Sequence, residues 1–196
     1  MAQIGSYGEL LTMYDEVKSV LANRLHPENA EITKRHILVC GDTGCQVSDS
    51  QQIVEQFERL IQKHGLQNVV SVSITGCFGF CGVGPIVKIF PDDVVYVSIT
   101  PEDAVEIIDG HIIGGTVVRK FLYKEPALQK RVTTQHEMSF YKKQQRSVLR
   151  NCGIINSTKI EEYIANQGYQ ALGKALTKMS PEDVIDTVKA SGLRGR

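Results

Sequence analysis

The amino-terminal part of the chain shows two kinds of apolar pattern, one with helical spacing and one made of short continuous runs. Residues 6–25 carry an apolar residue at nearly every third or fourth position, behind a capping box formed by Ser6 and Glu9. The apolar run at residues 36–39 is typical of a buried strand, and helical spacing returns over residues 49–64. These patterns predict a helix, a strand and a second helix.

Three further apolar runs complete the predicted sheet. Residues 69–74 read as one strand, and residues 86–90 and 94–97 flank a Pro-Asp-Asp sequence that is typical of a hairpin. A helix is expected to start at Thr100, where a capping residue, a proline and two acidic residues follow one another. We interpret the order as a βαββα core preceded by one helix. This is an α/β fold that suits a small thioredoxin-like sheet covered by helices.

The second half of the chain differs in pattern and in charge. Residues 36–114 hold ten acidic and three basic residues, whereas residues 115–150 hold nine basic and two acidic residues and show weak periodicity. We predict an extended, basic, partner-contacting connector there. Helical spacing returns after residue 150, with Ser157 and Ser180 as expected helix caps. The predicted domains are therefore residues 1–114, the connector, and a small helical segment over residues 151–196.

Composition limits the classes of function. The chain has 196 residues, 42% hydrophobic and 22% charged, as in ordinary globular proteins. It contains no apolar run of membrane-spanning length and no signal-peptide pattern, so a cytoplasmic location without a membrane partner is expected. The basic stretch lacks the interleaved aromatics of a nucleic-acid module, so a protein partner or the acidic first domain is the expected contact.

Four of the five cysteines form two pairs. Cys40 and Cys45 have C-x4-C spacing, Cys77 and Cys81 have C-x3-C spacing, and each pair follows a predicted strand. A set of four thiolates suits an iron–sulfur cluster or a structural zinc ion, and a thiol–disulfide pair is the third alternative. We interpret Cys152 as a small buried thiol outside this set.

The residues around the pairs favour a [2Fe-2S] cluster, which needs two sulfurs on each iron. Glycines at positions 76, 79, 82 and 84 allow backbone N–H groups to approach the sulfurs, and nearby apolar side chains could exclude water. Zinc knuckles usually use shorter C-x2-C turns, and the C-x-x-C of redox enzymes is absent from the two pairs. No residue of the chain is expected to act as an acid, base or nucleophile.

The segment CGDTGC, followed after 31 residues by CFGFCGVGP, resembles the thioredoxin-like [2Fe-2S] ferredoxin domain associated with the flavoprotein subunits of respiratory NADH dehydrogenases and hydrogenases. This resemblance covers residues 36–112. It implies that Cys40, Cys45, Cys77 and Cys81 are the cluster ligands.

The sequence from residue 144 onward resembles the opening of the NADH-binding flavoprotein subunit of the same enzymes. A ferredoxin domain placed directly before this opening is similar to the beta subunit of cytoplasmic electron-bifurcating [FeFe]-hydrogenases and of NADP-reducing hydrogenases. The resemblance implies a catalytic [FeFe] subunit and a small iron–sulfur subunit as partners. It also implies FMN and NAD(P) bound only in a longer subunit, by a glycine-rich loop of which Gly195 is the first residue. A respiratory NADH dehydrogenase, an NAD-dependent formate dehydrogenase and a zinc-stabilised assembly module remain alternatives.

Overall fold

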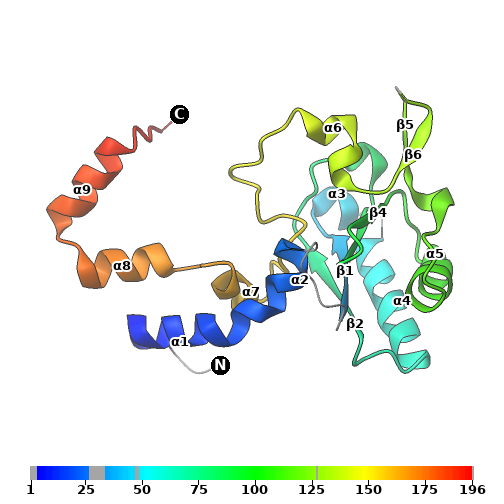
Figure 1. Cartoon of the computed structure of the whole chain (residues 1–196), viewed down its shortest axis with the longest axis horizontal. Coiled ribbons are helices and arrows are strands. Elements are labelled where there is room, and N and C mark those ends of the chain that lie inside the picture. The colour runs from blue at the N-terminus through cyan, green and yellow to red at the C-terminus, as the bar shows by residue number, and fades with distance from the viewer. Residues whose placement is uncertain (1–3, 27–33, 47–48, 127, 196) are drawn as a thin grey trace. The chain divides into compact units, whose positions relative to one another are not determined.

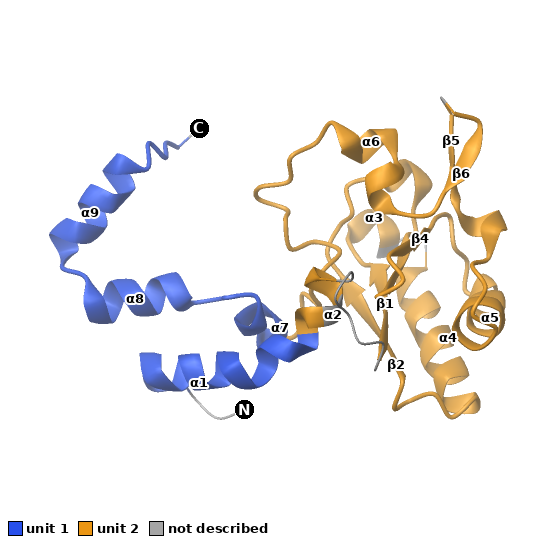
Figure 2. Ribbon diagram, viewed as in Figure 1, with its two compact units in different colours: residues 1–20, 160–196 blue, residues 21–159 orange. Residues whose placement is uncertain are grey.

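The computed structural model describes residues 4–26, 34–46, 49–126 and 128–195, and the chain forms two compact units. One unit contains Met1–Val20 and Ile160–Arg196, so it combines both ends of the chain. The other unit is continuous and contains Leu21–Lys159 (Figure 2).

The larger unit is built on a four-stranded sheet in the order β2-β1-β3-β4 (Figure 1). The strands are β1 (Arg35–Cys40), β2 (Val70–Thr75), β3 (Val87–Phe90) and β4 (Val94–Tyr96). The pair β1 and β2 is parallel, whereas β1 with β3 and β3 with β4 are antiparallel. The predicted hairpin is therefore confirmed. The order along the chain is βαβββα rather than βαββα, because both apolar runs of the hairpin form strands.

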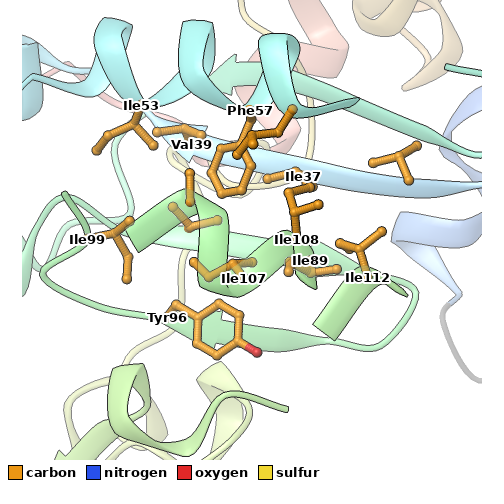
Figure 3. Close-up of a cluster of buried hydrophobic side chains, with 14 of the residues drawn as sticks. Ile37, Val39, Ile53, Phe57, Ile89, Tyr96, Ile99, Ile107, Ile108 and Ile112 are labelled. Carbon is orange, nitrogen blue, oxygen red and sulfur yellow. The ribbon is translucent and has the colours of Figure 1, made fainter. Parts of the chain in front are cut away.

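Helices cover one face of this sheet. Helix α4 (Ser50–Lys63) buries the predicted apolar stripe, and α5 (Asp103–Glu106) continues as a π-helical segment, η4 (Ile107–Ile113). Figure 3 shows Phe57 of α4 close to side chains of β1 and η4. The cluster of fully buried side chains here includes Ile37, Val39, Ile53, Phe57, Ile89, Tyr96, Ile99, Ile107 and Ile108. Burial of this apolar surface stabilises the larger unit.

The other face of the sheet is covered by the segment that was predicted to be an extended connector. This part of the prediction is wrong: residues 115–150 contain η5 (Arg119–Phe121), β5 (Tyr123–Glu125), β6 (Lys130–Val132), η6 (Gln135–Glu137) and α6 (Ser139–Lys142). Val132, Met138 and Tyr141 are buried in one cluster with Cys40 and Val95. Val95 of β4 donates its N–H group to the Thr133 carbonyl, and Val97, which follows β4, donates to the Phe121 carbonyl, both at 2.9 Å. The edge strand β4 is therefore paired with this segment.

The smaller unit consists of helices only, within its described residues. These are α1 (Tyr7–Val17), α7 (Ile160–Ala165), α8 (Gln170–Lys178) and α9 (Pro181–Ala190), and α1 packs against α7 and α8. The predicted caps at Ser6 and Ser180 are confirmed, because each hydroxyl accepts a hydrogen bond from the third following N–H group. Apolar side chains on and after α8 remain more than half exposed, namely Leu172, Leu176, Ile185, Val188 and Leu193.

The predicted helix over residues 6–25 is interrupted. A 3-10 turn, η1 (Lys18–Leu21), separates α1 from the short α2 (Ala22–Leu25), and the boundary between the two units falls at the end of this turn. In the larger unit, the Arg24 side chain donates to the Ile154 carbonyl at 2.9 Å. In the described part of the chain, none of the helices has the length and apolar character to cross a membrane. The functional domain boundaries at residues 114 and 150 stay a prediction.

Candidate metal centre

The sheet topology explains why the two cysteine pairs come together. Cys40 is the last residue of β1 and lies opposite Thr75, the last residue of β2, from which the chain continues to Cys77. The carboxyl ends of parallel neighbouring strands lie at the same edge of a sheet, so the loops that follow them meet there. The N–H group of Gly41 donates to the Thr75 carbonyl at 3.1 Å and joins the two loops at their base.

The four predicted cysteines line one small hollow, together with Phe78, Gly79, Phe80, Gly84 and Ile86. Cys40 and Cys45 are buried, with their sulfur atoms 2.9 Å apart, whereas Cys77 is partly buried and Cys81 is exposed. All five cysteines of the chain are free thiols. Across the described ranges, no group of three or more His, Cys, Asp and Glu side chains is arranged to hold a single metal ion.

Backbone N–H groups point at two of the sulfurs. Ile86 donates to Cys40 Sγ at 3.0 Å, and Gly79 donates to Cys77 Sγ at 3.2 Å. Gly79 has φ +80°, a conformation that a side chain disfavours, and a Cβ at Gly84 would lie 3.4 Å from Cys45 Sγ. The glycines therefore let the backbone come close to the sulfurs, as the sequence pattern predicted.

Burial changes the ionisation of these thiols. It raises the pKa of Cys40, and the neighbouring Cys45 thiol adds to the shift. Burial also raises the pKa of Cys77, although the hydrogen bond from Gly79 acts in the opposite direction. Both side chains are consequently thiols rather than thiolates when no cation compensates the charge. A soft metal supplies that compensation, because a coordinated thiol loses its proton.

Aromatic side chains surround the second cysteine loop, residues 76–82. Phe80 stacks on Phe140 with ring centroids 4.1 Å apart, and it makes edge contacts with Tyr123 and Tyr141. The Tyr141 hydroxyl donates to the Phe78 carbonyl at 2.9 Å. Burial raises the pKa of Tyr141 to about 12, so this hydroxyl keeps its proton at neutral pH.

A second group of residues that the sequence reasoning missed also contacts this loop. Arg146 donates to the carbonyl of Cys77, and Gly153 lies against the Phe78 ring. Cys152 also packs here, since a Cβ at Gly76 would lie 2.9 Å from its sulfur. The sequence pattern predicts Cys152 at the start of a helical domain, and the structure instead places it beside the second cysteine loop.

Several polar side chains outside the cysteine set have structural partners. His111 is buried with its Nδ1 2.8 Å from the Tyr96 hydroxyl, which agrees with a structural role. Asp92 and Asp93 pair with Arg35 and Lys88, at 2.8 and 2.7 Å. Gly195 is exposed, and a Cβ there would meet no atom within 4 Å. Its assignment to a cofactor loop stays a prediction.

Comparison with known proteins gives relatives of two kinds. A 2Fe-2S ferredoxin of Clostridium pasteurianum is 39% identical in an alignment of 97 residues, which covers 44% of this chain and 93% of the relative. The NADP-reducing hydrogenase subunit HndC of Solidesulfovibrio fructosivorans is 56% identical over 55 residues, but these are 28% of this chain and 11% of HndC. The NADH-quinone oxidoreductase of Aquifex aeolicus has a subunit that is 62% identical over 37 residues, which are 19% of this chain and 8% of that subunit.

Among solved structures, the thioredoxin-like [2Fe-2S] ferredoxin from Aquifex aeolicus is 31% identical, with a TM-score of 0.42 over 45% of this chain and 94% of that one. The family described as thioredoxin-like [2Fe-2S] ferredoxin matches residues 10–111, which is more than half of the chain. The donor set fits the cofactor of this family, because four cysteines and two N–H donors surround one hollow. The chain belongs to the thioredoxin-like [2Fe-2S] ferredoxin family, and its cofactor is a [2Fe-2S] cluster.

Proposed function

We propose that this chain is the electron-transfer module of an NAD(P)-linked hydrogenase complex, and that Cys40, Cys45, Cys77 and Cys81 hold its [2Fe-2S] cluster. The observation that carries the ligand assignment is the shared hollow at the ends of β1 and β2, which all four side chains line. The four sulfurs occur as two interacting pairs, Cys40 with Cys45 and Cys77 with Cys81. Two sulfurs for each iron is the arrangement that a [2Fe-2S] cluster requires.

The bound cluster supplies reversible uptake of one electron at a time. The residues of the chain provide its surroundings. Ile86 and Gly79 donate N–H groups to the ligand sulfurs, which favours the extra negative charge of the reduced state. Phe78 and Ile86 are buried at the wall of the hollow and exclude water from that side. Cys81 is exposed, so the second loop offers the edge at which an electron partner would approach.

Two observations support a place in a larger oxidoreductase. The chain matches a 2Fe-2S ferredoxin over most of that protein and, separately, single subunits of an NADP-reducing hydrogenase and of an NADH-quinone oxidoreductase. The apolar side chains that α8 and α9 expose are typical of helices that pack against further protein. We infer that residues 151–196 open a flavoprotein domain in which FMN and NAD(P) bind, with Gly195 at the start of the cofactor loop.

A hydrogenase is favoured over a respiratory NADH dehydrogenase because the match to HndC, 56% identical over 55 residues, is longer than two matches to NADH-quinone oxidoreductase subunits. Those two are 62% identical over 37 residues and 41% identical over 49 residues. The proposed partners are a catalytic [FeFe] subunit and a small iron–sulfur subunit, and electron bifurcation between them is the finer proposal. Purification of the native complex under anaerobic conditions tests this step. Reduction of the cluster by H2 in that complex supports the proposal, whereas co-purification with a quinone- or formate-linked subunit contradicts it.

The ligand assignment is tested on the purified chain. We expect iron and acid-labile sulfide in equal amounts, and an electron paramagnetic resonance signal after reduction with dithionite. Cys77→Ala should lose this signal and most of the iron. Cys152→Ala is the matched control, because it removes a thiol beside the same loop that is not a proposed ligand. Full iron content in Cys77→Ala, or zinc without sulfide in the unaltered chain, would overturn the assignment.

A further inference from the structure

The second cysteine loop is held by residues that lie outside the family match. The match ends at residue 111, yet side chains from residues 123–153 contact this loop along much of its length. Two of these contacts are hydrogen bonds to consecutive carbonyl groups. Arg146 Nη2 donates to the Cys77 carbonyl at 3.4 Å, and Tyr141 Oη donates to the Phe78 carbonyl at 2.9 Å. The peptides that follow Cys77 are thus anchored from outside.

The anchor on Phe78 also fixes the direction of the next N–H group. In a trans peptide, the C=O and N–H groups point to opposite sides. The Phe78 carbonyl points at the Tyr141 hydroxyl, so the N–H group of Gly79 points away from it, and it donates to Cys77 Sγ at 3.2 Å. Gly79 has φ +80° and a Cβ there would meet no atom within 4 Å, so the loop itself offers little to hold this peptide.

Arg146 holds the preceding peptide. Its Nη2 atom lies 3.4 Å from the carbonyl oxygen of Cys77, 3.0 Å from that of Leu149 and 3.1 Å from that of Cys152, so its two N–H groups are shared among three acceptors. Arg146 is partly buried, whereas all the remaining residues of the range 142–150 are exposed. Its guanidinium therefore joins the second cysteine loop to the turn at residues 149–152, and it keeps its positive charge at any physiological pH.

We propose that Tyr141 and Arg146 are positioning residues that aim the Gly79 N–H group at Cys77 Sγ and thereby raise the reduction potential of the cluster; this rests on the proposed function of Cys77 as a ligand. Reduction adds negative charge to the centre. An N–H donor at the sulfur and a nearby cation both stabilise that charge, so losing either lowers the potential. The potential of this ferredoxin domain then depends on a segment that lies beyond the residues matched to the family.

The test measures the midpoint potential, the electron paramagnetic resonance spectrum and the iron and sulfide content of Tyr141→Phe and Arg146→Gln in the full chain. Both substitutions should lower the potential and shift the spectrum while the cluster is retained. Arg146→Lys, which keeps the charge, should restore most of the potential.

Two matched controls isolate the effect. Tyr123→Phe removes a hydroxyl from the same aromatic group, where the contact with Phe80 is through the ring. Lys143→Gln removes an exposed positive charge from the same segment. Neither control should move the potential.

The outcomes separate this inference from the proposed function. If Tyr141→Phe and Arg146→Gln keep both the cluster and the potential of their controls, the positioning role is wrong while Cys77 remains a ligand. If Tyr141→Phe alone loses the cluster, the hydroxyl holds the loop as proposed, and the potential of Arg146→Gln then decides the electrostatic part. A cluster that survives Cys77→Ala would instead refute the ligand assignment on which the inference rests.

Discussion

Replacing Gly153 with alanine should loosen the attachment of the 149–153 turn to the second cysteine loop. Gly153 has φ +81°, and an added Cβ would lie 2.5 Å from one carbon of the Phe78 ring and 3.0 Å from another. Phe78 is only 2% exposed, so its ring has little space into which it can move. The Gly153 N–H group also donates to the Thr75 hydroxyl at 3.0 Å, which ties the turn to the end of β2.

Two costs contribute to the expected destabilisation. Placing alanine in a left-handed conformation costs about 1–2 kcal/mol. Forcing a methyl group into a packed site typically costs about 1–3 kcal/mol. We therefore expect the free energy of unfolding of the larger unit to fall by about 2–5 kcal/mol if the costs add.

Gly65→Ala separates the two costs. Gly65 has φ +67°, but a Cβ there would meet no atom within 4 Å, so this variant carries the backbone cost alone. Urea unfolding of both variants, followed by circular dichroism on protein loaded with the cluster, should show Gly153→Ala less stable by about 1–3 kcal/mol. Equal unfolding midpoints for the two variants would refute the close packing of Gly153 on Phe78.

Two further predictions concern the core of the larger unit. Phe57→Ala should lower the free energy of unfolding by about 3–5 kcal/mol, because the ring is fully buried between α4 and the sheet; a urea-unfolding loss below about 1 kcal/mol would contradict that packing. Burial lowers the pKa of His111, so the unfolded chain takes up a proton as the pH falls below about 6.5 before the folded protein does, and stability is lost in that range. His111→Gln should remove this part of the loss, which is checked by comparing urea midpoints at pH 7.5 and pH 5.5, and an unaltered pH dependence in the variant would count against it.

The spacing of apolar residues was sufficient to predict the helices in which that spacing is regular. The apolar stripe of α4 repeats every three or four residues, and its five members are buried: Ile53, Val54, Phe57, Leu60 and Ile61. The same reasoning failed at residues 18–21, where the apolar period continues through a 3-10 turn. Periodicity indicates which side of a helix is covered, and it does not indicate that two different units cover its two halves.

The cysteine loops were predictable and their support was not. The spacing of the cysteines and the predicted strand before each pair were sufficient to predict that Cys40 and Cys77 lie near each other. Their role as ligands stays a prediction. Tyr141 lies 63 residues from Phe78, in a stretch whose apolar residues have no regular period. Its charges suggested an extended connector. The tertiary contacts of Tyr141 and Arg146 determine the conformation there, and no local pattern encodes those contacts.

The smaller unit is built from both ends of the chain, and this has a consequence for folding during synthesis. Helix α1 leaves the ribosome long before α7 and α8 are translated, yet Leu10 of α1 is buried in this unit and Gly173 of α8 packs against the Tyr7 ring. The newly made first helix must therefore keep its apolar side uncovered, or shielded by a chaperone, while the ferredoxin sheet assembles. A message cut short at codon 159 would yield a polypeptide whose opening helix never meets the helices that cover it.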